Sequence, residues 1–195
     1  MSDLSAPLGD GHTLLPDDDR AGLLQPDIAT RQELFAAEQR NIATALLRPQ
    51  PTLPVLLDDR YLRGLHKAMF GEVLARAGRY RRSETNIGIP PTYITEEVRK
   101  VVDDAATWVE HKTYEPDELA VRFHHRLVDI HPFANGNGRH SRISADLLIA
   151  NLGRAAFSSG HNLGLPTETR RQRYLAALHS ADAGEIDDLV SFARS

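Results

Sequence analysis

Hydrophobic residues recur every three or four positions over most of the chain, which is the period of an amphipathic helix. The clearest case covers residues 58–77, and Gly78 follows as a helix-ending residue. The apolar face of this helix is formed by Leu62, Leu65, Met69, Val73 and Leu74. The same period predicts further helices over residues 95–111, 116–130, 138–151, 167–180 and 185–193. The pattern therefore predicts an all-α domain.

The N-terminal part of the chain has a different pattern. Proline, glycine and aspartate are frequent before the first predicted helix, which indicates an irregular arm. Thr30 and Glu33 then have the spacing of a capping box, so we expect a helix that begins there and ends near Leu47. The residues expected to face the core are Phe35, Ile42 and Leu46. We divide the chain into an N-terminal arm and helix over residues 1–57 and a domain over residues 58–195.

Residues 80–93 lack the helical period. Asn86–Pro91 is typical of a short extended hairpin or an exposed loop, so we expect a small β-hairpin in the all-α domain. The arginines beside it, Arg79, Arg81 and Arg82, are interpreted as a solvated face.

Composition narrows the functional classes. The chain has no cysteine, which excludes disulfides, thiolate zinc sites and cysteine nucleophiles. Its formal net charge of −4 argues against non-specific binding to nucleic acid. No apolar run reaches the ~18 residues of a membrane span, and the first residues do not resemble a signal peptide. We therefore expect a cytoplasmic protein that binds neither nucleic acid nor membrane.

The segment after the helix over residues 116–130 carries the candidate chemistry. Pro132 ends that helix and leaves His131 at its end, facing a loop. The loop Asn135–Gly138 is rich in residues that tolerate positive φ, and it leads directly into a new helix whose free amides can bind an anion. Arg139 and Arg142 stand in the first turn of that helix, where cations cost roughly 0.3–1 kcal/mol each. A bound polyphosphate would reverse this cost, and the spacing of three predicts that both arginines reach the same ligand.

Other interpretations of this segment are weaker. It lacks the GK[ST] ending of a P-loop and follows a helix rather than a strand. A lone histidine at a helix end is usually structural. Four histidines could suggest zinc, but no carboxylate completes a usual ligand set. These histidines are His124, His125, His131 and His140.

The stretch His131-Pro-Phe-Ala-Asn-Gly-Asn-Gly-Arg-His-Ser-Arg142 resembles the signature of Fic-domain proteins, HxFx(D/E)GNGRxxR. Every fixed position agrees except Asn135, where the family usually has an acid. The resemblance extends over roughly residues 58–195, and in detail it is nearest to the Fic proteins called mobile mystery protein B. It implies a Fic-type helical domain preceded by an N-terminal helical extension.

The resemblance also implies roles for the matching residues. His131 would be the general base that deprotonates a target hydroxyl, which attacks the α-phosphate of ATP and releases pyrophosphate. The nucleotide phosphates would be held by Gly136, Asn137, Gly138, Arg139 and Arg142. Relatives that phosphorylate their targets carry lysine at the position of Gly138, so glycine favours nucleotidyl transfer. Phe133 would anchor the loop in the core.

Three further roles follow from the same resemblance. Asn135 matches the acid that binds Mg²⁺, and as an uncharged amide it would be a weaker ligand. The flap at Ile87, Gly88 and Ile89 would bind the target protein by strand addition. Many relatives are restrained by a glutamate that pairs with the second arginine of the signature, here Arg142. Glu38 is the candidate for that glutamate, although Leu34 and Gln39 beside it depart from the family pattern. A separate antitoxin protein is the alternative source of restraint.

The function implied is that of a protein adenylyltransferase, an AMPylator that transfers AMP from ATP to a hydroxyl side chain of a target protein. Such a nucleotidyltransferase could be the toxin half of a toxin–antitoxin pair. Two alternatives remain open at this point. One is a deAMPylase that removes AMP through the same site, and the other is a catalytically weak, nucleotide-binding Fic scaffold.

Overall fold

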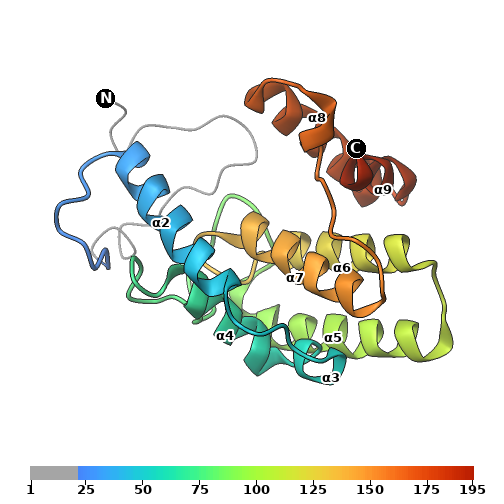
Figure 1. The fold of residues 1–195 in the computed structure, drawn as a ribbon. Coiled ribbons are helices and arrows are strands. Elements are labelled where there is room, and N and C mark those ends of the chain that lie inside the picture. Colours follow the sequence, from blue (N-terminus) through green and yellow to red (C-terminus); the bar gives the residue numbers. More distant parts are fainter. Residues whose placement is uncertain (1–21) are drawn as a thin grey trace.

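The computed structural model describes residues 22–195 (Figure 1). Their α-helices are α2 (Arg31–Leu46), α3 (Leu53–Leu56), α4 (Asp59–Phe70), α5 (Ile94–His111), α6 (Pro116–Ile130), α7 (Asn137–Asn151), α8 (Thr167–Asp182) and α9 (Asp187–Arg194). Two short 3₁₀ helices, η1 (Pro91–Tyr93) and η2 (His161–Leu163), complete the regular structure. No β-strand occurs between residues 22 and 195, so the all-α class is confirmed. The start of the predicted arm, with the acidic residues 17–19, lies outside the described residues.

Helix α6 lies at the centre of the fold. It packs against α5, α7 and α9, while α4 joins α2 to α7. In Figure 1, α5, α6 and α7 lie side by side, with α2 and α4 toward one end and α8 and α9 against another face of α6. The predicted inward positions of α6 are all buried, and they are Leu119, Phe123, Leu127 and Ile130. None of the helices over residues 22–195 has the length and apolar character needed to cross a membrane.

Helix α2 begins as predicted but buries a different face. The hydroxyl of Thr30 accepts from the backbone N–H of Glu33, and the Glu33 carboxylate accepts from that of Thr30 at 2.8 Å, so the capping box is confirmed. The expected inward residues Phe35 and Leu46 are instead 56% and 53% exposed. The face that packs toward α4 consists of Leu34, Ala37, Glu38, Ile42 and Ala45. The buried face of α2 includes Glu38 because its carboxylate has polar partners in the interior, Asn135 and Arg139.

Helix α4 ends earlier than its apolar pattern predicts. It stops at Phe70, and residues 71–78 turn back instead of continuing to Ala77. The turn pairs with the chain before α2, because Leu24 donates its backbone N–H to Val73 and Ala75 donates to Gly22. These backbone hydrogen bonds replace the helical ones, so the apolar residues of the turn are buried without being helical. Helix α3 was not predicted from the apolar pattern, and Pro54 lies in its first turn, where proline is tolerated.

The predicted β-hairpin is also absent from the described chain. The backbone N–H of Ile89 donates to the carbonyl of Ile130 at 3.4 Å, so the flap pairs with the end of α6 and not with itself. The guanidinium of Arg81 donates to the carbonyls of His131, Ser83 and Ile89. Carbonyls at a helix C-terminus lack intrahelical donors and attract a cation. Arg81 is therefore 4% exposed, and its interpretation as part of a solvated face was wrong.

Candidate active site

His131 lies at the junction of α6 and the loop that follows. It is the C-cap of α6, in the left-handed conformation with φ 53°, and is 5% exposed. Burial lowers its pKa to about 4, although the nearby Val128 carbonyl opposes this shift, and the charge of Arg81 lowers the pKa further. The ring is therefore neutral at pH 7. Its Nδ1 lies 3.4 Å from the carbonyl oxygen of Val128, which can only accept, so the neutral ring carries its proton on Nδ1 and a lone pair on Nε2.

The flap contacts His131 at Gly88. Gly88 has φ 97°, and a Cβ at that position would collide with the Cβ of His131. The backbone of the flap therefore lies directly against the histidine. The target-binding role of residues 87–89 stays a prediction.

The loop after His131 is braced by side chains. Asn137 donates to the carbonyl of Phe133 at 2.6 Å and accepts from its backbone N–H at 2.8 Å. Phe133 is buried, and its ring stacks on His66 with the centroids 3.8 Å apart. Nε2 of His66 donates to the carbonyl of Asn135 at 2.9 Å, while Nδ1 accepts from the backbone of Gly78 at 3.0 Å. The anchoring role expected of Phe133 is consistent with this packing.

His66 was missed by the sequence analysis. Its position among Leu62, Leu65 and Met69 on the buried face of α4 was the available signal, since a histidine there must find polar partners.

The start of α7 presents backbone donors. Gly136 has φ 77°, and a Cβ there would lie 2.5 Å from the Phe70 ring, so only glycine fits. The first helical bond runs from His140 to the carbonyl of Gly136. The N–H groups of Asn137, Gly138 and Arg139 precede it and lack intrahelical acceptors, and no side chain caps them. Three amides at the positive end of a helix are an arrangement that can bind an anion.

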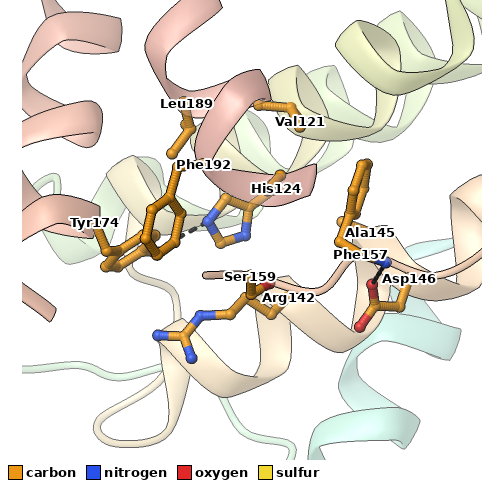
Figure 2. Close-up of a pocket in the computed structure, with 11 residues that line it drawn as sticks. Val121, His124, Arg142, Ala145, Asp146, Phe157, Ser159, Tyr174, Leu189 and Phe192 are labelled. Atoms are coloured by element: carbon orange, nitrogen blue, oxygen red, sulfur yellow. Dashed lines mark hydrogen bonds between the residues drawn. The ribbon is translucent and has the colours of Figure 1, made fainter. Parts of the chain in front are cut away.

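The two arginines of this helix point to different neighbours. Nη1 of Arg139 forms an ion pair with Glu38 at 2.8 Å, and its guanidinium lies 4.9 Å from the centre of the Phe70 ring. The guanidinium of Arg142 lies 4.8 Å from the ring centre of Tyr174 on α8, as Figure 2 shows. The two guanidinium groups thus have different neighbours in this structure, and the prediction that both reach one ligand stays a prediction. Side chains three residues apart diverge by about 60° around a helix, and each cation follows its own partner.

Glu38 connects α2 to the loop. Its carboxylate accepts from the side-chain amide of Asn135 at 3.0 Å and pairs with Arg139, and its residue is 3% exposed. The family pattern led us to expect Arg142 as the partner of this glutamate. The partner is Arg139 instead, because Arg142 turns toward α8.

The side chains around Asn135 do not fit a protein-held magnesium site. The amide oxygen of Asn135 accepts from the backbone of Gly136 at 2.7 Å, and the nearby carboxylate of Glu38 is already paired with a cation. Residues 22–195 contain no group of three or more histidine, cysteine or acidic side chains able to hold a metal. The histidines suggested as zinc ligands have separate partners, such as the Leu62 carbonyl for His140. The described residues around Asn135 therefore offer Mg²⁺ no carboxylate comparable to that of the family signature.

The described residues form an all-helical fold. One short loop joins the buried, neutral His131 to the start of α7, whose amides can bind an anion. Residues 56–149 match the Fic/DOC family, so the chain carries a Fic/DOC domain. Protein adenylyltransferase fic-1 of Caenorhabditis elegans is 32% identical over 136 residues, which are 66% of this chain and 25% of that protein. Protein adenylyltransferase Fic of Drosophila melanogaster is 30% identical over 134 residues, with the same coverage. The chain spans about a quarter of the length of these curated relatives.

Solved structures show the same fold. The structure of Fic-1 (residues 134–508) from C. elegans has a TM-score of 0.63 and 26% identity, and the match covers 89% of this chain and 51% of that one. The N-terminal FIC domain of Bep8 from Bartonella sp. 1-1C has a TM-score of 0.67 with 16% identity, covering 87% and 88% of the two chains. The second match extends over nearly the whole of both chains and concerns the fold alone.

Proposed function

We propose that this protein is a protein adenylyltransferase that transfers AMP from ATP to a hydroxyl side chain of another protein. The observation that carries the proposal is the placement of a neutral His131 beside the open amides at the start of α7. A proton acceptor and a phosphate-binding site are thereby joined by one short loop. The names of the curated relatives support the same reaction.

The reaction follows from these groups. The hydroxyl oxygen of the target attacks the α-phosphorus of ATP, and its proton passes to Nε2 of His131. The bond from the α-phosphorus to the oxygen that bridges it to the β-phosphate breaks, and pyrophosphate leaves with the electron pair. The amides of Asn137, Gly138 and Arg139 and the two guanidinium groups of α7 hold the phosphates, which fixes donors where negative charge develops.

The lowered pKa of His131 is compatible with this role. A general base is most efficient when its pKa lies near the operating pH, and a value of about 4 is low for that. The negative charge of a bound triphosphate stabilises the protonated ring and raises the pKa. Nucleotide binding would therefore bring the pKa of the base closer to the operating pH.

The flap is proposed to hold the target. Both backbone groups of Ile89 are already used, by the Ile130 carbonyl and by Arg81, so strand addition would rely on Ile87 and Gly88. Because Gly88 touches His131, a target segment paired there would bring its hydroxyl close to the base.

The metal and the cellular setting also belong to the proposal. Mg²⁺ bound to ATP would neutralise phosphate charge, and it would be held by the phosphate oxygens because the side chains around Asn135 do not fit it. A cytoplasmic location agrees with the absence of cysteine. A place in a toxin–antitoxin pair is proposed from the resemblance to the Fic family alone.

Glu38 is proposed to restrain the reaction. Its carboxylate occupies Arg139, which the phosphates of ATP would also bind, so the two anions compete for one guanidinium. Helix α2 would then act as the restraint within the chain, and a separate antitoxin would be the source of restraint if removal of Glu38 has no effect.

The test uses ATP labelled on the α-phosphate, the purified chain and a lysate of the host. We expect label on protein, with the nucleotide mass found by mass spectrometry, and no label with His131→Ala. Release of label from pre-modified protein without transfer would indicate a deAMPylase. Saturable ATP binding with neither reaction would indicate a nucleotide-binding scaffold, and either result would overturn the proposal.

A further inference from the structure

The side chain of Arg142 leaves α7 toward the C-terminal helices. Its guanidinium carbon lies 4.8 Å from the centre of the Tyr174 ring, and its Nη2 lies 3.7 Å from where a Cβ on Gly138 would stand. The guanidinium therefore lies between an aromatic face of α8 and the Cα of Gly138, in the first turn of α7. An arginine in this place links the phosphate-binding end of α7 to a helix outside the Fic signature.

Tyr174 is itself held in place. Nε2 of His124 on α6 lies 3.0 Å from the Tyr174 hydroxyl, and the Phe192 ring of α9 lies 5.6 Å away between centroids. Burial lowers the pKa of His124 to about 3, and the charge of Arg142 contributes to that shift. The histidine is therefore neutral and forms a neutral hydrogen bond with the hydroxyl. Figure 2 shows Tyr174, His124 and Arg142 around one small cavity between α6, α7 and α8.

Arg142 differs from Arg139 in the kind of partner that stabilises its charge. Arg139 has the Glu38 carboxylate, whereas no carboxylate lies within ion-pair distance of Arg142 in the described part of the chain. Nε of Arg142 and Nδ1 of His124 are buried and make no hydrogen bond among the described residues. A buried donor without a partner is costly, and it is expected where a ligand or ordered water completes the site. Asp146 lines the same cavity and interacts electrostatically with Arg142, but it forms no ion pair with the guanidinium, so the aromatic face holds a cation that can still pair with an anion.

We propose that Tyr174 is a positioning residue that holds the Arg142 guanidinium at the anion-binding start of α7. This inference rests on the proposed function and adds to it a residue from α8. Arginine loses much rotamer entropy when it is immobilised, so a side chain fixed before the ligand arrives binds it more tightly. The C-terminal helices thereby help to set the affinity of the site for a polyphosphate, although they supply no residue of the signature.

The experiment measures the Kd of ATP and of inorganic tripolyphosphate by calorimetry for a double-mutant cycle. A cation–π contact is worth up to ~2 kcal/mol when desolvated, so Tyr174→Leu should weaken binding by about tenfold. In the Arg142→Ala background the same change should have no further effect. Tyr174→Phe keeps the ring but loses the hydroxyl that His124 contacts, so its loss of affinity should be smaller than that of Tyr174→Leu.

Phe157→Leu is the matched control. Phe157 lines the same cavity, and its ring carries a different arginine, Arg194, at 4.4 Å. Its loss removes a comparable contact away from the anion site and should leave both Kd values unchanged. Tyr174→Met, which fills more of the ring volume, replaces the leucine variant if circular dichroism shows that the latter does not fold.

Equal losses of affinity in the parent and the Arg142→Ala background would make Tyr174 merely structural and overturn the inference. An unchanged Kd in Tyr174→Leu would overturn it as well. Coupling between the two residues in tripolyphosphate binding, together with no transfer of AMP by the parent, would support the positioning role and overturn the adenylyltransferase. Transfer of AMP by the parent without coupling between Tyr174 and Arg142 would support the adenylyltransferase and overturn the positioning role.

Discussion

The side-chain amide of Asn135 donates a hydrogen bond to the Glu38 carboxylate at 3.0 Å, across 97 positions of the sequence. This contact gives a structural reason for the departure from the Fic signature. Aspartate at position 135 would place two carboxylates at hydrogen-bond distance, whereas asparagine supplies a donor. The amide that weakens the magnesium site is therefore the group that fastens α2 to the loop.

Asn135→Asp should destabilise the protein at pH 7, because a half-buried carboxylate would face the buried carboxylate of Glu38 with no hydrogen between them. We expect a loss of roughly 1–3 kcal/mol, the usual cost of an unsatisfied buried polar contact, measured by urea unfolding. Millimolar Mg²⁺ should restore part of the loss, since a cation between the carboxylates relieves their repulsion. The variant combined with Glu38→Gln should be close to the parent. A single variant as stable as the parent without metal would show that this hydrogen bond does not matter.

Glu38→Gln should raise the affinity for ATP several-fold and increase AMP transfer. The neutral amide keeps the size of the glutamate but no longer neutralises Arg139, so the guanidinium becomes available to phosphate. ATP titration and labelling of target protein measure the two effects. Glu33→Gln is the control, since it alters the cap of the same helix far from the loop. Unchanged affinity in a folded Glu38→Gln protein would assign the restraint to an antitoxin.

His131→Ala should lower the transfer rate by about 10²–10⁴-fold, the usual contribution of a general base. The Kd of ATP should change little, because the phosphates are held by backbone amides and arginines of α7. Single-turnover labelling and calorimetry separate these effects. Transfer within a few-fold of the parent rate would exclude His131 as the base.

Gly88→Ala should reduce transfer while leaving ATP affinity unchanged. The added Cβ collides with that of His131, so the flap and the base must separate. Gly153→Ala is the matched control, because Gly153 has the similar φ of 77° but nothing within 4 Å of its Cβ position. Both changes carry the backbone strain of a positive φ, and only the first should affect catalysis. Equal rates for the two variants would contradict the close approach of flap and base.

Stability should fall as the pH decreases from about 6.5 to about 4. Burial lowers the pKa of His131 and His140 to about 4 and that of His124 to about 3, and it lowers the pKa of His66 well below 6.5. The unfolded chain therefore binds protons that the folded chain does not, so the free energy of unfolding rises with pH across this window. Each histidine contributes a slope of up to ~1.4 kcal/mol per pH unit. Urea titrations at several pH values measure it, and a flat profile would show that these rings are solvated.

The sequence predicted the elements whose signals are local. The spacing of apolar residues located α5 to α9 within a few positions, and the capping box located the start of α2. The rotation of α2 could not be predicted from its apolar residues, because a buried carboxylate, that of Glu38, has its partners about a hundred residues away. The role of Arg81 was missed for the same reason, since its acceptors are carbonyls at the end of a helix formed 50 residues later. A stretch of glycine and proline was interpreted as a hairpin because its backbone partners on α6 were unknown.

The buried guanidinium of Arg81 has a mechanical consequence. One side chain bonds the carbonyl of Ser83 before the flap tip, the carbonyl of Ile89 after it, and the carbonyl of His131. Arg81 thus joins the flap, which is proposed to bind the target, to His131, which is proposed to take its proton. The two would keep a fixed relative position before a target binds. The distance between the flap and His131 would then be constant. A hydroxyl would be modified only when the bound segment places it at that distance from the flap. Selection of the target residue would then depend on its place along the segment more than on the identity of its neighbours.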